Sequence, residues 1–174
     1  MKNKLFGLLI LIGSYSSAVF ALDGMAVIDM RTAVLATQSA QNAFKALESD
    51  SDYAANVERA QSLQSDRQAL AERLQKEAET LSQDQITDIQ RNIQEQTKDL
   101  EFIVGKIQTK QNETADKVFR ELNPTLQRIL QELIAAKQVK VLLGKETVLF
   151  ADTAMDLTDD VTSMLDVAAK ESKE

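Results

Sequence analysis

The segment Ser82–Ile107, SQDQITDIQRNIQEQTKDLEFIVGKI, carries the pattern that decides the fold. Its apolar residues recur every seven positions, at Ile86, Ile93, Leu100 and Ile107. Apolar residues at this spacing form a narrow stripe on one face of an α-helix, and such a stripe packs against one other helix. The helical periodicity extends over residues 38–137. We therefore predict a long hairpin of two antiparallel helices.

Three local signals in the sequence predict where the helical hairpin starts, turns and bends. Ser82 and Gln85 have the spacing of a capping box, which predicts the turn between the two arms and the start of the second. Pro124 lies inside the second arm, where it predicts a kink or a restart of the helix. The polar residues 49–52 predict a break or a bend before the first arm.

Short apolar runs at both ends of the chain predict a small sheet. Residues 25–30 are apolar and β-branched at their centre, and they read as a buried strand followed by a short helix over residues 31–35. Residues 139–143 and 147–150 read as a β-hairpin with Gly144 in its turn. Thr158 is the expected N-cap of a last helix.

These elements define a mainly α fold with a small β body. We expect residues 22–48 and 123–168 to form the body, residues 49–122 to form the helical hairpin inserted into it, and residues 169–174 to be a disordered tail. Three short strands leave unsatisfied sheet edges, so we expect an oligomer to supply the missing burial.

The first 21 residues have the features of a cleaved signal peptide. Lys2 and Lys4 precede an apolar run over residues 5–12, and small residues lead to a cleavage site after Ala21. The alternative is a retained membrane anchor, but this run is too short to span a bilayer comfortably. We therefore expect export of the chain.

The charge of the chain argues against nucleic acid as a partner. The formal net charge is −7, from 20 basic and 27 acidic residues. Loss of Lys2 and Lys4 with the signal peptide leaves 18 basic residues and a net charge of −9. Proteins that bind duplex nucleic acid usually carry the opposite sign, and an acidic chain is also repelled by anionic lipid.

The residue types needed for most catalytic sites are missing. The chain has no His and no Cys, which removes the usual nucleophile pairs and most zinc sites. Gly144–Lys145 is not a phosphate loop, because Glu146 stands where Ser or Thr is needed. We predict no catalytic residue, no metal, no cofactor and no enzymatic activity.

The order of these features resembles the Skp/OmpH family of periplasmic chaperones. The residues that carry the resemblance lie at both ends, at 26–35, 141–152 and 156–161, with a proline in the returning helix as at Pro124. The resemblance implies a homotrimer in which the strands form a central β body and three helical hairpins project around a cavity. It also implies that the cavity holds unfolded outer-membrane β-barrel proteins, here called clients, without ATP.

The implied function assigns two sets of residues. The stripe along the arms is the expected client-contacting surface, with the candidates Leu63, Leu70, Leu74, Ile89, Ile93 and Ile103. The strands are the expected trimer contacts, with the candidates Val27, Ile28, Val141, Leu143, Val148 and Phe150. The alternative that this second set only fills the core of a single chain stays open.

Two further alternatives concern partners. Well-known members of the family are basic, whereas this chain is acidic, so a contact with lipid or lipopolysaccharide is not carried over. A different class of protein, a structural coiled-coil adaptor that bridges folded periplasmic partners, also fits the helical pattern.

Overall fold

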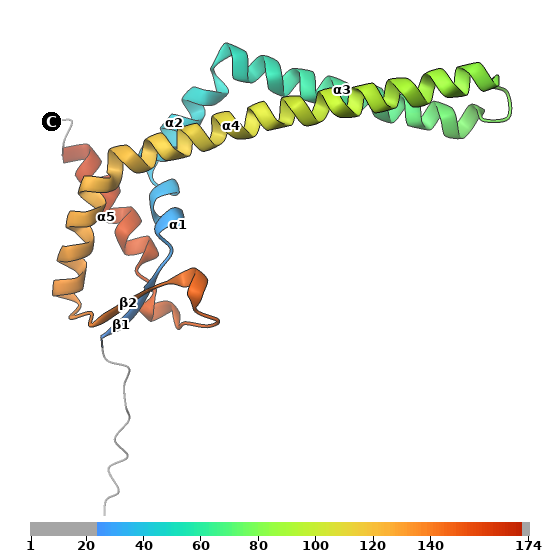
Figure 1. The fold of residues 1–174 in the computed structure, drawn as a ribbon. Helices are drawn as coiled ribbons and strands as arrows, with labels where there is room; N and C mark the ends of the chain where they lie inside the picture. The colour runs from blue at the N-terminus through green and yellow to red at the C-terminus, as the bar shows by residue number, and fades with distance from the viewer. Residues whose placement is uncertain (1–23, 172–174) are drawn as a thin grey trace, which may run out of the picture.

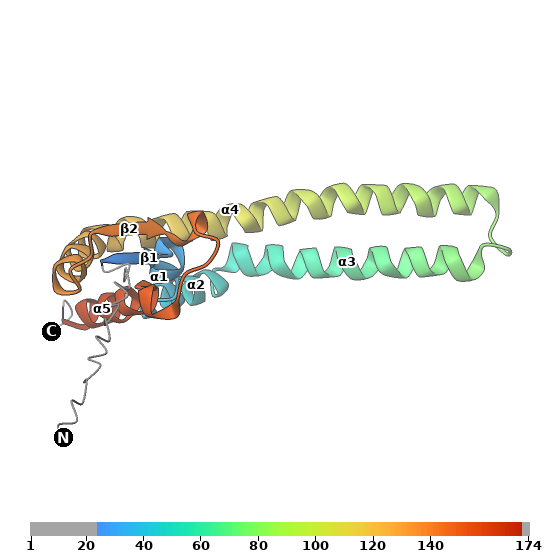
Figure 2. The same cartoon turned by 90° about the horizontal axis from the view of Figure 1, so that it is seen from below.

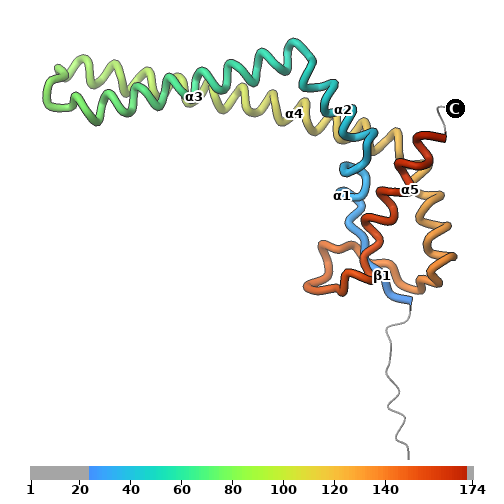
Figure 3. Tube along the Cα trace, turned by 180° about the vertical axis from the view of Figure 1, so that it is seen from behind, coloured from blue at the N-terminus to red at the C-terminus, as the bar shows by residue number. Residues whose placement is uncertain are grey.

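The computed structural model describes residues 24–171 and shows a small body from which one long helical arm projects (Figure 1). The proposed signal peptide lies outside the described residues. The arm stands off the body in all three overall views, and its two helices lie side by side along its length (Figures 2 and 3).

The body is organised around a two-stranded parallel sheet. Strand β1 (Met25–Ile28) pairs with β2 (Val141–Gly144) in a register that runs from Met25 opposite Val141 to Ile28 opposite Gly144. Parallel strands need a long crossover connection, and helices α1 to α4 together form it. The prediction of a strand at residues 25–30 is confirmed over its first four residues.

The predicted β-hairpin after residue 139 is wrong. Gly144 ends β2 with a φ of −67°, which is not the left-handed conformation that a tight hairpin turn uses. The chain then forms the short 3-10 helices η1 (Lys145–Thr147) and η2 (Thr153–Met155), and residues 147–150 are not a strand. Pairing with β1 replaces the local pairing that the sequence suggested.

Two short helices follow β1, and each begins at a side-chain cap. In α1 (Met30–Leu35) the Asp29 carboxylate accepts the Thr32 N–H at 2.8 Å. In α2 (Gln38–Glu48) the Thr37 hydroxyl accepts the Ala40 N–H at 3.2 Å. Such caps satisfy backbone donors that the first turn of a helix leaves unpaired.

The arm consists of α3 (Ser51–Glu77) and α4 (Gln83–Ala136). The polar stretch before the arm is a break, because α2 ends at Glu48 and Asp50 caps α3 by accepting the Tyr53 N–H at 2.9 Å. The predicted capping box is confirmed at the tip: Ser82 accepts the Gln85 N–H, and the Gln85 side chain accepts the Ser82 N–H at 2.9 Å.

Helix α4 passes through Pro124 without restarting, but it changes direction. Figure 1 shows the bend where the helix enters the body in orange. In a regular helix the N–H of residue 124 would donate to the Arg120 carbonyl. Pro124 has no N–H, so this hydrogen bond is missing, which explains a kink at this place. The bend separates the arm from a well-packed base in which Leu126, Ile129 and Leu133 are buried.

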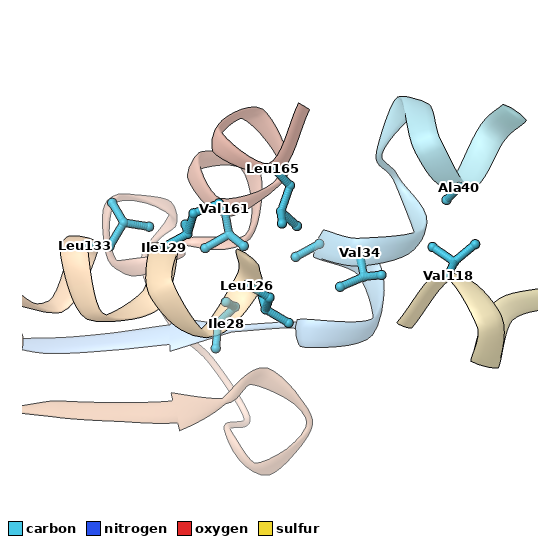
Figure 4. Close-up of a cluster of buried hydrophobic side chains, with 10 residues drawn as sticks. Ile28, Val34, Ala40, Val118, Leu126, Ile129, Leu133, Val161 and Leu165 are labelled. Atoms are coloured by element: carbon cyan, nitrogen blue, oxygen red, sulfur yellow. The ribbon is translucent and has the colours of Figure 1, made fainter. Parts of the chain in front are cut away.

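The core of the body gathers residues from both ends of the chain. Ile28 and Val34 meet α4 and the last helix α5 (Thr158–Glu171), which contributes Val161 and Leu165 (Figure 4). The disordered tail predicted from residue 169 is wrong for residues 169–171, because α5 continues through Glu171.

Thr158 is the first residue of α5 and not its N-cap. Its hydroxyl instead accepts the Asp29 N–H at 3.0 Å, and its own N–H donates to the Asp156 carboxylate at 3.0 Å. The predicted cap is therefore replaced by a hydrogen bond between the start of α5 and the end of β1.

Gln138 offers a test of the end of α4. It has a φ of 52°, and the Val139 N–H donates to the Ile134 carbonyl at 2.9 Å, which together form a Schellman motif with glutamine in the glycine position. We expect Gln138→Gly to raise the free energy of unfolding by about 1 kcal/mol, because glycine avoids the left-handed strain. Thermal denaturation measures the change, and Gln138→Ala, which keeps the Cβ atom, is the control. Equal melting temperatures for the two variants would contradict this reading.

Candidate functional site

The seam between α3 and α4 contains all six residues expected to contact a client. Ile89 and Ile103 are buried, with 5% and 4% of their surface exposed. The other four are half-buried: Leu63, Leu70, Leu74 and Ile93. The structure thus places these residues between the two helices of the arm, where their apolar surface already holds the hairpin together.

Polar groups interrupt this seam at two levels. Midway along the arm, Arg67 donates to the Thr97 hydroxyl at 3.3 Å, and the neighbouring Gln96 side-chain oxygen is buried without a hydrogen-bond partner within residues 24–171. Nearer the body, Gln111 donates to the Tyr53 hydroxyl at 2.9 Å. Polar layers of this kind fix the register of paired helices but weaken their packing. The arm is therefore a thin, loosely packed rod.

The exposed apolar residues of the arm are ones that the heptad pattern did not select. Phe102 is 65% exposed and Val104 is 37% exposed, on either side of the buried Ile103. A helix cannot bury three consecutive side chains against one neighbour, because successive residues point about 100° apart. The run Phe102–Val104 was therefore the signal in the sequence that could have revealed them.

The residues expected to form the trimer contacts divide into two groups. Val27 and Ile28 are each 3% exposed and belong to the core of the single chain. Val141 is 44% exposed, Phe150 is 86% exposed, and Leu143 and Val148 are half-buried. Leu149, which the sequence did not single out, is fully exposed beside Phe150. The segment after β2 thus carries two adjacent large apolar side chains that no other part of residues 24–171 covers.

A polar cluster anchors this exposed segment to the body. Lys145 donates to the Asp156 carboxylate at 2.6 Å, and both groups lie beside the Asp29 N–H to Thr158 hydrogen bond. Burial alone would raise the pKa of Asp156, but the bonds from Lys145 and Thr158 outweigh it and lower that pKa below its ordinary value. Hydrogen bonds from Thr32 likewise lower the pKa of Asp29.

The described residues place limits on other kinds of site. Over residues 24–171, no cluster of three or more acidic side chains is arranged to hold a metal ion. In the same part of the chain, no helix combines the length and apolar character needed to cross a bilayer.

A long helical hairpin on a small body with a two-stranded sheet defines a mainly α protein with an extended arm. The chain belongs to the OmpH-like family, because the family model described as "Outer membrane protein (OmpH-like)" matches residues 24–165.

Solved structures give a more distant likeness. One is a chain from Caulobacter crescentus CB15 that is provisionally assigned as an outer membrane chaperone (OmpH-like). It is 23% identical, the match covers 85% of this chain and 86% of that one, and the TM-score is 0.48. A comparison with curated protein sequences finds no match to this chain.

The polar cluster predicts how stability depends on acid. The lowered pKa values of Asp29 and Asp156 stabilise the fold at pH values above their ordinary pKa of 3.8, and this contribution is lost as the pH falls through the lower folded values. We expect the denaturant concentration at the midpoint of unfolding to decrease as the pH is lowered below about 4. In Asp156→Asn this decrease should be smaller.

Asp116→Asn is the control for this measurement, because Asp116 is exposed and makes no ion pair among the described residues. Chemical denaturation followed across the acid range compares the three proteins. An acid dependence that is unchanged in Asp156→Asn would remove the cluster as its source.

Proposed function

We propose that this protein is an ATP-independent holdase chaperone of the periplasm, which binds unfolded outer-membrane β-barrel proteins between helical arms and prevents their aggregation. The observation that carries the proposal is the family match over residues 24–165, on a chain whose arm projects from a small body. Residues 1–21 supply the export signal in this proposal.

The physical character of the arm supports weak and general binding. An unfolded barrel protein exposes the side chains that will face lipid, and these associate with one another in water. The seam of the arm is thin and broken by polar layers, so its helices offer shallow apolar surface rather than one deep pocket. Several arms around one cavity multiply such weak contacts by raising the effective concentration.

The proposal includes assembly into a homotrimer. Residues 22–48 and 123–168 form the associating body and residues 49–122 form the arm. In the described residues β2 pairs only with β1, which leaves its other edge free. Leu149 and Phe150, in the segment that follows β2, are exposed. Joining copies at this edge satisfies the free backbone groups and covers the two side chains.

The acidic charge of the chain disfavours partners that are themselves negatively charged. With a net charge of −9 after loss of the signal peptide, from 18 basic and 27 acidic residues, the chain gains little from attraction to acidic clients or anionic lipid, so client capture depends on apolar contact. Lipid, lipopolysaccharide and nucleic acid are not part of the proposal.

Light scattering tests the proposed activity directly. We expect the mature protein to suppress aggregation when a barrel protein is diluted from urea without nucleotide, because the arms cover the exposed apolar side chains. A structural adaptor for folded partners would leave the aggregation unchanged and would bind one native protein selectively. Aggregation that is equal with and without the protein refutes the chaperone function.

Phe150 tests the proposed assembly surface. Phe150→Asp should leave the single chain folded, because this side chain is 86% exposed, but should dissociate the trimer by burying an unpaired charge at the interface. Sedimentation velocity measures the oligomer and circular dichroism measures the fold. The control is Phe102→Asp, which places the same change on an exposed phenylalanine of the arm. A Phe150→Asp trimer as stable as the parent would exclude this surface.

A further inference from the structure

A groove lies on the arm between the first turns of α3 and the middle of α4, with a volume of about 840 Å³. Its apolar lining comes from Ala55 of α3 and from Phe102 and Gly105 of α4. Its α3 residues, Asp52, Ala55 and Asn56, lie in the first turns of that helix. These turns follow the break between α2 and α3, which Figure 1 shows at the body end of the arm. The seam residues considered above do not line it. We call it the Phe102 groove.

Phe102 gives the groove an aromatic wall. The side chain is 65% exposed, and the Lys106 ammonium lies 4.5 Å from the centre of its ring. This cation–π contact occupies part of the ring, while the rest of it is open to the groove. Exposed aromatic rings are frequent anchors in protein interfaces, because they bury a large apolar area with few rotatable bonds.

Gly105 lines the groove without a side chain, and no contact within residues 24–171 requires a glycine there. A Cβ atom at this position would meet nothing within 4 Å beyond its chain neighbours and the backbone of its own helix. The backbone is helical, and glycine inside a helix is less stable than alanine. The missing side chain therefore weakens the helix without relieving any contact in the chain, and its effect is to admit another group close to the backbone of α4.

The polar groups of the groove match a polypeptide backbone. Asn56 donates to the Asp52 carbonyl at 2.7 Å and Thr109 donates to the Gly105 carbonyl at 2.9 Å. The Asn56 side-chain oxygen and the Thr109 hydroxyl oxygen remain able to accept hydrogen bonds. An extended, unfolded polypeptide has free backbone N–H groups to donate, whereas lipid acyl chains have none.

The charges around the groove are of both signs. Lys106, Lys110 and Glu101 line the groove from α4, and Asp52 lines it from α3. Lys110 is paired with Glu113 at 3.5 Å, and Lys106 makes no ion pair among the described residues. A mixed rim suits a polypeptide that carries both charges better than a uniformly anionic ligand such as lipid headgroups.

We propose that the Phe102 groove holds one aromatic or large aliphatic side chain of an unfolded client segment. The side chain packs against Phe102 over Gly105, and the backbone of the segment donates to Asn56 and Thr109. This inference rests on the proposed function and places one point of client contact outside the seam of the arm.

Cross-linking locates the contact. The chain has no cysteine, so a single introduced cysteine can carry a photoactivated cross-linker in the full-length mature protein. Gly105→Cys should cross-link severalfold more to a urea-unfolded outer-membrane β-barrel protein than Val104→Cys does. Val104 is the matched control, because it is adjacent and 37% exposed but does not line the groove. Equal cross-linking at the two positions would overturn the proposal.

Filling the groove tests it independently of folding. Gly105→Leu should weaken binding of the same unfolded barrel protein by about tenfold, since the added side chain occupies the space over the backbone. Gly105→Ala should weaken it less, and both variants should melt at a higher temperature than the parent because both residues favour helix over glycine.

The outcomes separate the two proposals. If the parent protein binds no unfolded client, the proposed function fails and the groove has no role. If the parent binds and Gly105→Leu binds equally well, the chaperone function stands and the Phe102 groove is excluded. Weaker binding by Gly105→Leu at an unchanged or raised melting temperature supports the groove.

Discussion

The parallel pairing of β1 with β2 is the contact on which the rest of the structure depends. It joins Met25–Ile28 to Val141–Gly144, so the two ends of the described chain meet in one body. The Leu157 N–H donates to the Val27 carbonyl at 2.9 Å on the other side of β1, and this bond brings α5 onto the core. The pairing thus holds both ends of the crossover, and the hairpin of α3 and α4 projects from the body that it closes (Figure 1).

The apolar residues of the body are more deeply buried than those of the arm. In the body, Leu126, Ile129 and Leu165 are nearly inaccessible to solvent and contact several elements at once. In the arm, each helix has only one neighbour, so most stripe residues stay half-buried and the seam includes Arg67, Gln96 and Gln111. One thin apolar seam therefore holds the two helices of the rod together. A rod of this kind fits the proposed weak contact with many client sequences.

The sequence predicted the features that depend on neighbouring residues. The capping box at Ser82, a strand within residues 25–30 and a kink or restart at Pro124 were predicted from local chemistry. The structure has the capping box, a strand at Met25–Ile28 and a bend in an unbroken α4. The β-hairpin after residue 139 was wrong because the choice of a strand's partner is not local. Residues 141–144 pair with a segment from the other end of the chain, and the neighbouring run at 147–150 is left without a partner. The candidate client contacts lie on the seam because periodicity identifies the face of a helix that packs against its neighbour, and exposed residues such as Phe102 carry no periodic signal.

The distance along the chain between β1 and β2 also has a consequence for folding. Contacts within the hairpin of α3 and α4 join residues that are close in sequence near the tip, so this part gains stability as soon as the turn at Ser82 forms. The sheet and the docking of α5 need the whole chain and must overcome the entropy of closing a loop that contains every helix of the crossover. We therefore expect the arm to form before the body from which it projects.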